Sequence, residues 1–153
     1  MVRVVLAAAA LALLAGCGGA VRVDPPTPQG ATATACSKLN DRLPHTLDGA
    51  ERVPSEPRSP YVAVWGGAEI ALRCGVHRPV AMDPLQQVPE INGVAWFADP
   101  VRPALFTAIT RDGYIEVTIS RRHETAGVLV DLADPIKAAF PVESTQAPAS
   151  PAS

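Results

Sequence analysis

The residue whose surroundings indicate the most definite chemistry is Cys17, the first of three cysteines in this 153-residue chain. It directly follows Leu14-Ala15-Gly16, at the end of an alanine- and leucine-rich run that begins after Arg3. A basic start, a short apolar stretch and small residues before a cleavage point are typical of a secretory signal. With a cysteine directly after Leu-Ala-Gly, the segment resembles the lipobox of bacterial lipoproteins. The resemblance implies cleavage after residue 16 and attachment of a diacylglyceryl group to the Cys17 sulfur.

The alternative for this segment is an uncleaved membrane helix with an incidental cysteine. Such a helix needs about 20 apolar residues, whereas the run spans 4–15 and is followed by Gly16, Gly18 and Gly19. We therefore expect a signal peptide over 1–16 and an acylated, palmitate-bearing Cys17. Because two acyl chains hold a protein firmly on a bilayer, we expect it on the extracytoplasmic face of the cell membrane.

The remaining cysteines, Cys36 and Cys74, form an even pair in a chain that we expect to be exported. An oxidising compartment favours a disulfide between them. Cys36 shares a helical stripe with Leu39 and Leu43, and Cys74 lies on the apolar face of an alternating segment. Both side chains are therefore expected to face the same core. Two separate buried thiols are the alternative.

Other reactive residue types form no recognisable site. His45, His77 and His123 lack the paired spacing of metal ligands, so we interpret them as exposed loop side chains. No serine lies in a Gly-x-Ser-x-Gly turn. We therefore predict no catalytic residue, no metal and no cofactor, with a metal site assembled only in three dimensions as the alternative.

A weaker signal comes from aromatic and arginine residues near expected hairpins. Such residues are common anchors of binding surfaces. The candidate binding residues are Trp65, Arg73, Trp96, Arg111 and Tyr114. The simpler alternative is that the tryptophans belong to the core and the arginines only solvate the surface.

Periodicity predicts the elements that would position these residues. Residues 34–43 have helical spacing, and Pro44 ends the run. A second helical pattern covers 125–140, where Pro135 predicts an interruption and a second short helix capped by Asp134. Alternating or β-branched runs predict strands over 61–65, 69–76, 94–97, 105–110 and 114–120. We expect an α+β fold, a small antiparallel sheet of four or five strands with an N-terminal and a C-terminal helix packed on it.

Composition limits the partners. The formal net charge is −2, and the basic residues form no cluster beyond Arg121-Arg122. This weak acidity argues against nucleic acid and against electrostatic attachment to anionic lipid. Only Lys38 and Lys137 are lysines, and alanine, proline and valine are abundant, which is typical of a GC-rich genome and suggests an actinobacterial source.

Several short motifs, in this order and spacing, resemble an actinobacterial family of secreted or lipid-anchored proteins, the domain of unknown function 3515. They are Cys36, Leu39, Leu43-Pro44, Trp65-Gly66, Leu72-Arg73-Cys74-Gly75-Val76, Pro79, Gly93-Val94, Trp96, Phe106-Thr107, Arg111, Tyr114 and Glu116-Val117. The resemblance runs from about Cys36 to Leu132. The chain departs from the family pattern at Gly67-Ala68 and at Ser120. The family implies secretion or lipid anchoring and no established activity.

We therefore interpret the chain as a signal peptide (1–16), a flexible tether (17–33), one α+β domain (34–140) and a disordered tail (141–153). The expected function is that of a lipid-anchored, non-catalytic binding or accessory component of cell-envelope assembly, with an envelope protein or cell-wall material as partner. One alternative is an enzyme acting on the cell wall, which would bring ionisable groups with perturbed pKa values together in one cleft. The other is a small-ligand binder with an enclosed apolar pocket.

Overall fold

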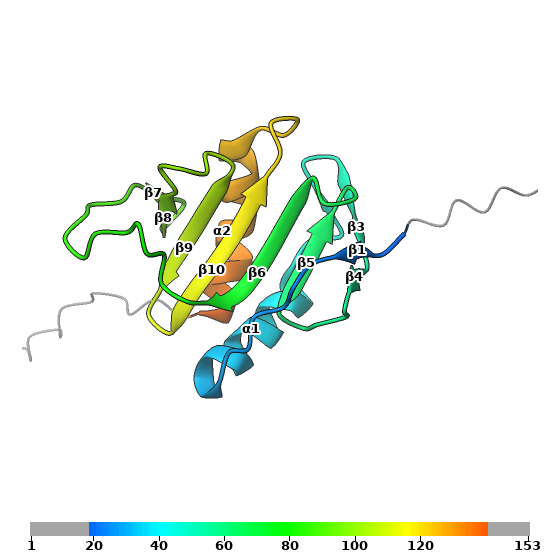
Figure 1. The fold of residues 1–153 in the computed structure, drawn as a ribbon, viewed down its shortest axis with the longest axis horizontal. Coiled ribbons are helices and arrows are strands. Elements are labelled where there is room, and N and C mark those ends of the chain that lie inside the picture. The colour runs from blue at the N-terminus through cyan, green and yellow to red at the C-terminus, as the bar shows by residue number, and fades with distance from the viewer. Residues whose placement is uncertain (1–18, 141–153) are drawn as a thin grey trace, which may run out of the picture.

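The computed structural model describes residues 19–140, so that Cys17 and the expected tail at 141–153 lie outside it. The described chain forms strands and two helices in one continuous arrangement (Figure 1). In chain order these elements are β1 (Val21–Arg22), α1 (Gly30–Arg42), β2 (Thr46–Leu47), β3 (Ala50–Val53), β4 (Ser55–Glu56), β5 (Val62–Trp65), β6 (Ile70–Val76), β7 (Glu90–Ile91), β8 (Val94–Ala98), β9 (Leu105–Thr110), β10 (Gly113–Ile119) and α2 (Thr125–Ala139).

Eight of these strands form one antiparallel sheet in the order β2-β3-β5-β6-β10-β9-β8-β7. A separate parallel pair joins β1 to β4. The described chain is therefore mostly β, and the expectation of a small sheet with four or five strands is wrong. The five runs with a clear β pattern correspond to β5, β6, β8, β9 and β10, which make up the centre of the sheet.

The strands that the sequence pattern missed are short and lie toward the two edges of the sheet. β2 and β7 have two residues each, and β3 has four, including Glu51 and Arg52. So short a segment cannot display the two-residue alternation by which strands are recognised. Edge strands also tolerate charged side chains, because one of their sides faces water. These segments become strands only because the central strands offer them partners.

Both helices cover the same face of the sheet, which we call the inner face, and lie behind it in Figure 1. Helix α1 begins at Gly30, before the expected boundary at residue 34. Helix α2 runs without interruption through Pro135, so the predicted break there is wrong. Leu132 and Ile136 on either side of the proline are both buried in the core, and this packing offsets the lost backbone hydrogen bond.

Cys36 of α1 and Cys74 of β6 form a disulfide with their Cα atoms 5.5 Å apart, which confirms the predicted pair. Both residues are fully buried in the main core. The bond therefore ties the first helix to the centre of the sheet, where β6 also pairs with β5 and β10.

Replacing both cysteines by serine, Cys36→Ser with Cys74→Ser, should lower the free energy of unfolding by about 2–5 kcal/mol. The bridge joins residues 38 positions apart, and its loss frees that loop in the unfolded chain. Urea unfolding of both proteins, followed by intrinsic tryptophan fluorescence, measures the difference. Alkylation of two cysteines in the unreduced protein carrying Cys17→Ser would contradict the bridge.

Candidate functional site

The face of the sheet opposite the helices, the outer face, is covered only in part. Residues 23–28, which we call the strap, run from β1 to the start of α1 and lie against this face (Figure 1). The backbone oxygen of Asp24 accepts a hydrogen bond from Nε of Arg73 on β6, at 3.0 Å. We expected residues 17–33 to form a flexible tether, but the described part of that segment includes a strand, the strap and the first turn of α1.

The strap can pass close to β6 because residue 75 is a glycine. Gly75 has a φ of +85°, in the left-handed region that favours glycine. A Cβ at this position would lie 2.5 Å from Cβ of Pro28. The pairing of β6 with β10 shifts its register next to Gly75, between Tyr114 and Ile115. A side chain at residue 75 would therefore push the strap away from the sheet.

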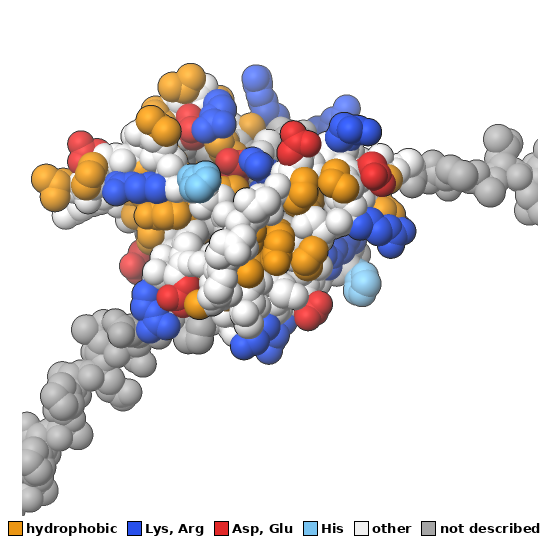
Figure 2. Space-filling view, turned by 60° about the horizontal axis from the view of Figure 1, so that its bottom comes forward, with side chains coloured by type: hydrophobic (Ala, Val, Ile, Leu, Met, Phe, Trp, Pro, Cys, Tyr) orange, Lys and Arg blue, Asp and Glu red, His pale blue; other side chains and the backbone are white. Residues whose placement is uncertain are grey.

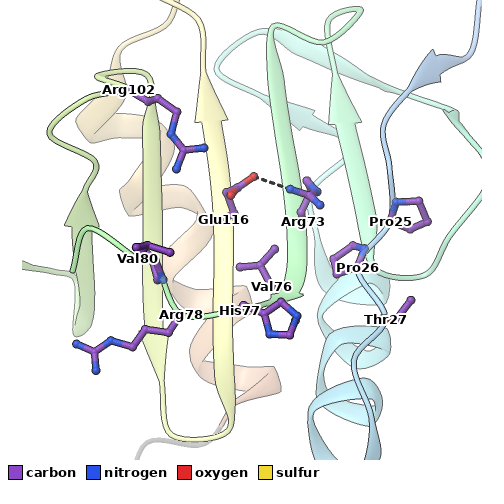
Figure 3. A pocket seen from close by; sticks show the side chains of 12 residues that line it. Pro25, Pro26, Thr27, Arg73, Val76, His77, Arg78, Val80, Arg102 and Glu116 are labelled. Carbon is purple, nitrogen blue, oxygen red and sulfur yellow. Dashed lines mark hydrogen bonds and ion pairs between the residues drawn. The ribbon is translucent and has the colours of Figure 1, made fainter. Parts of the chain in front are cut away.

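Between the strap and the loop that follows β6 lies a cavity of about 360 Å³, which we call the outer-face groove. Figure 3 shows the strap prolines along one side of it, the side chains of β6 and β10 at its floor, His77 and Arg78 below, and Val80 on the side opposite the prolines. Its lining residues are Pro25, Pro26, Thr27, Arg73, Gly75, Val76, His77, Arg78, Pro79, Val80, Arg102 and Glu116. Three arginines and a histidine thus surround one carboxylate.

The pairing of β6 and β10 sets the charged floor of the groove. Arg73 and Glu116 are direct cross-strand partners, and Nη1 of Arg73 lies 3.0 Å from Oε1 of Glu116. The arginine is about one-third exposed, and this pair together with the strap carbonyl fixes its orientation. A guanidinium carries five N–H donors, so that Arg73 retains donors for a ligand.

A second arginine reaches the groove from the loop before β9. Nη2 of Arg102 lies 2.7 Å from Oδ2 of Asp99, whose other oxygen accepts the backbone amides of Val101 and Arg102. The hydrogen bond from Arg102 is the main cause that lowers the pKa of Asp99, and the same bond raises the pKa of Arg102. Both groups therefore remain charged at neutral pH, and Arg102 is held in place.

The rim of the groove combines charge with exposed apolar side chains. Arg78 donates to the backbone oxygen of Met82, and in Figure 3 its guanidinium points away from Glu116. Val80 is fully exposed, as is most of Leu85 farther along the same loop. This loop projects from the body of the protein, where Figure 2 shows hydrophobic side chains beside basic ones at the left end.

Of the five candidate binding residues, only Arg73 lines the groove. Trp65 and Trp96 are fully buried in the core beneath the sheet. Nε1 of Trp65 donates to the backbone oxygen of Pro44 at 3.0 Å, whereas Nε1 of Trp96 has no hydrogen-bond partner within residues 19–140.

The other two candidates lie on the last hairpin. Arg111 is exposed at the hairpin turn, where it pairs with Asp112 at 3.3 Å. Tyr114 is half-buried on β10, paired with Ile109 and Val76, and is not among the groove residues. The structure therefore does not bring the five together.

Sequence reasoning missed most of the groove, namely Arg102, Glu116 and the strap prolines. The Asp99-Pro100 pair is a local signal for the turn that places Arg102. An aspartate side chain often accepts a hydrogen bond from the backbone amide two residues later in the chain. The facing of Arg73 and Glu116 left no local signal, because it depends on which strands pair and in which register.

A separate cluster forms around His123, where three connections between elements meet. Its Nδ1 lies 2.9 Å from Oδ2 of Asp48 in the turn before β3, and its Nε2 lies 3.2 Å from Oε2 of Glu69 before β6. Glu69 also pairs with Arg122 at 2.8 Å. The His123 side chain is only 8% exposed, so the expectation that it is an exposed loop residue is wrong, whereas His45 and His77 are exposed.

The cluster shifts the titration of all three groups. Burial alone would lower the pKa of His123, but the hydrogen bonds that its ring donates to Asp48 and Glu69 outweigh burial and raise that pKa above 6.5. The pKa of Asp48 is lowered mainly by its hydrogen bond with His123. The pKa of Glu69 is lowered mainly by the hydrogen bond that it accepts from Arg122. In residues 19–140 no group of histidine, cysteine or acidic side chains could hold a metal ion.

A family model described as "Protein of unknown function (DUF3515)" matches residues 1–145. The chain belongs to this family. The match confirms the family resemblance and extends it beyond the motifs between Cys36 and Leu132. No curated protein and no solved structure matches the chain. None of the helices formed by residues 19–140 is long and apolar enough to span a membrane.

The His123 cluster predicts how the stability of this family member depends on pH. The raised pKa of His123 contributes stability that is complete below 6.5 and is lost as the pH rises through the raised value. The lowered pKa values of Asp48 and Glu69 contribute stability that is complete above pH 3.8 and pH 4.5, their ordinary pKa values. This stability is lost as the pH falls through the lowered values. The unfolding free energy should therefore be higher at about pH 5.5 than at about pH 9.

Urea unfolding of the wild type and His123→Gln at both pH values provides the measurement. The variant should lose most of this difference, because glutamine carries no proton that titrates in this range. His77→Gln is the matched control, since His77 is exposed. An unchanged pH dependence in His123→Gln would show that the cluster does not stabilise the fold.

Proposed function

We propose that this protein is a lipid-anchored, extracytoplasmic binding or accessory component of cell-envelope assembly in an actinobacterium. Acylation of Cys17 attaches it to the membrane. The domain binds an anionic envelope component in the outer-face groove and carries out no chemistry on it. The Leu14-Ala15-Gly16-Cys17 motif supports the anchor.

The observation that carries the proposed binding role is the fixed position of two arginines in the groove. Arg73 is held by Glu116 and by the strap, and Arg102 is held by Asp99. Guanidinium groups bind carboxylate and phosphate through paired hydrogen bonds. Because these side chains are already oriented, a ligand does not have to order them, which favours binding.

The charged groups favour binding over the two alternatives. An enzyme would gather ionisable groups with perturbed pKa values in one cleft. Within residues 19–140, such groups gather around His123, which contacts Asp48 and Glu69 where loops between strands and helices meet. None of these three residues lines the groove. A small-ligand binder would enclose an apolar pocket, whereas the groove is lined by Arg73, Arg78 and Arg102.

The anchor is tested by expressing the full chain and the Cys17→Ala variant in an actinobacterial host with a labelled fatty acid. The wild type should carry the label and fractionate with the membrane. The variant should be unlabelled, because Cys36 and Cys74 are bonded to each other and neither follows a Leu-Ala-Gly motif. Equal labelling of both proteins would contradict the anchor.

The groove is tested with soluble, carboxylate-bearing peptidoglycan fragments released by a muramidase, added to the mature chain carrying Cys17→Ser. The Arg73→Gln/Arg102→Gln double variant should bind these fragments at least about tenfold more weakly than the parent, because charge-assisted hydrogen bonds are lost. Isothermal titration calorimetry measures the affinity.

The matched control is Arg111→Gln/Arg121→Gln, which removes the same charge from exposed positions outside the groove. It should bind as the parent does. If the groove variant and the control bind equally, the groove is not the binding site. Appearance of new fragments during incubation with the parent would instead establish an enzyme.

A further inference from the structure

A second concentration of arginine lies at a different place, beside the β1–β4 pair. A cavity of about 410 Å³, which we call the arginine pocket, opens between α1, β3 and the segment that leads into β5. Its lining residues are Asn40, Arg52, Pro54, Ser55, Arg58, Ser59, Pro60 and Val62. The lining thus includes two arginines and no carboxylate.

Arg52 is oriented in this pocket by neutral groups and has no carboxylate partner among the lining residues. Its two terminal nitrogens donate to the backbone oxygen and to the side-chain oxygen of Asn40, the former at 3.2 Å. Its guanidinium also lies over the Trp65 ring, 5.8 Å from the ring centroid. Partial burial lowers the pKa of Arg52, and the negative charge of Asp41 partly opposes this shift. Asp41 does not line the pocket. The charge is therefore partly desolvated, and no carboxylate lines the pocket beside it.

Neutral donors accompany this charge. Oγ of Ser59 accepts the backbone amide of Tyr61 at 3.1 Å, which leaves its own O–H free to donate. Arg58 is exposed on the same segment and makes no hydrogen bond or ion pair with another described residue. The guanidinium groups of Arg52 and Arg58 and the hydroxyl of Ser59 line the same pocket, and together they match the several acceptor oxygens of a phosphate group.

The pocket is also close to the start of the described chain. Val21 of β1 pairs directly with Ser55, which lines the pocket. Cys17 precedes Val21 by four residues, and four residues span at most about 14 Å. Figure 2 shows basic side chains above and below the point where the described residues meet the preceding chain, with acidic ones between them. An acyl group on Cys17 would therefore keep this pocket near the bilayer surface.

From this arrangement we infer that the arginine pocket is a phosphate-binding site, in which Arg52, Arg58 and Ser59 bind the phosphate group of a ligand. Its location favours the head group of an anionic lipid in the anchoring membrane over a soluble phosphate ester. The low net charge of the chain does not argue against this, because the site depends on local geometry and not on a long-range field. The phosphate site does not depend on the proposed function. Only the inference that the ligand is a membrane lipid rests on the proposed anchor at Cys17.

The test uses the mature chain carrying Cys17→Ser, so that no covalent lipid contributes to binding. One arm measures cosedimentation with vesicles of phosphatidylcholine, with and without phosphatidylglycerol. The other arm adds glycerol phosphate and follows the backbone amide signals of Ser55 and Ser59 by NMR. Binding that requires phosphatidylglycerol supports a lipid ligand, and glycerol phosphate binding alone supports the site with a soluble ligand. Absence of binding in both arms overturns the proposal.

The residues are tested with Arg58→Gln, which should weaken binding in the positive arm by about tenfold. Its side chain is exposed and has no partner to lose, so the variant should fold normally. Arg52→Gln should weaken binding at least as much, with its melting temperature measured in parallel because Arg52 also contacts Asn40 and Trp65.

Arg111→Gln is the charge-matched control. If Arg58→Gln and the control bind with equal affinity, the proposed site is overturned even if the protein binds vesicles. If only the fatty-acid labelling of Cys17 fails, the anchor is contradicted and the phosphate site is not.

Discussion

The antiparallel pairing of β6 with β10 is the interaction from which both faces of the sheet follow. On the inner face it sets Ile70 opposite Ile119, Leu72 opposite Val117 and Cys74 opposite Ile115, all buried in the main core. On the outer face the same register sets Arg73 opposite Glu116. Because side chains alternate along a strand, a shift of either strand by one residue would turn its core residues outward and separate Arg73 from Glu116. Core and groove are therefore specified together.

The two faces then differ because only one of them is covered by helices. The disulfide holds α1 on the inner face, where α2 packs beside it. The outer face is covered by the strap on one side and by the loop after β6 on the other, and the groove is the space between them. Since the strap follows directly from the segment that contains Cys17, the proposed anchor and one wall of the groove belong to the same stretch of chain.

The electrostatics illustrate how little a net charge says about local sites. The chain is slightly acidic overall, yet the outer-face groove and the arginine pocket together are lined by five arginines and one carboxylate. The two cavities use their arginines differently. In the outer-face groove, Arg73 and Arg102 are each paired with an acidic neighbour that orients them. In the arginine pocket, Arg52 is oriented by an amide and an aromatic ring, so that its charge is left to attract an anion.

The sequence by itself determined the features that depend on local periodicity: the five central strands, the two helical regions and the inward faces of Cys36 and Cys74, which made their disulfide predictable. It also determined family membership, through motifs dispersed over the domain. Of the outer-face groove it indicated only Arg73. The edge strands, the strap over Gly75 and the facing of Arg73 with Glu116 were decided by the tertiary structure. So was the contact of His123 with Asp48 and Glu69, 75 and 54 residues away in the chain. A local pattern reports which way a side chain points from its own element, but contacts between distant segments depend on strand order and register, which no local pattern encodes.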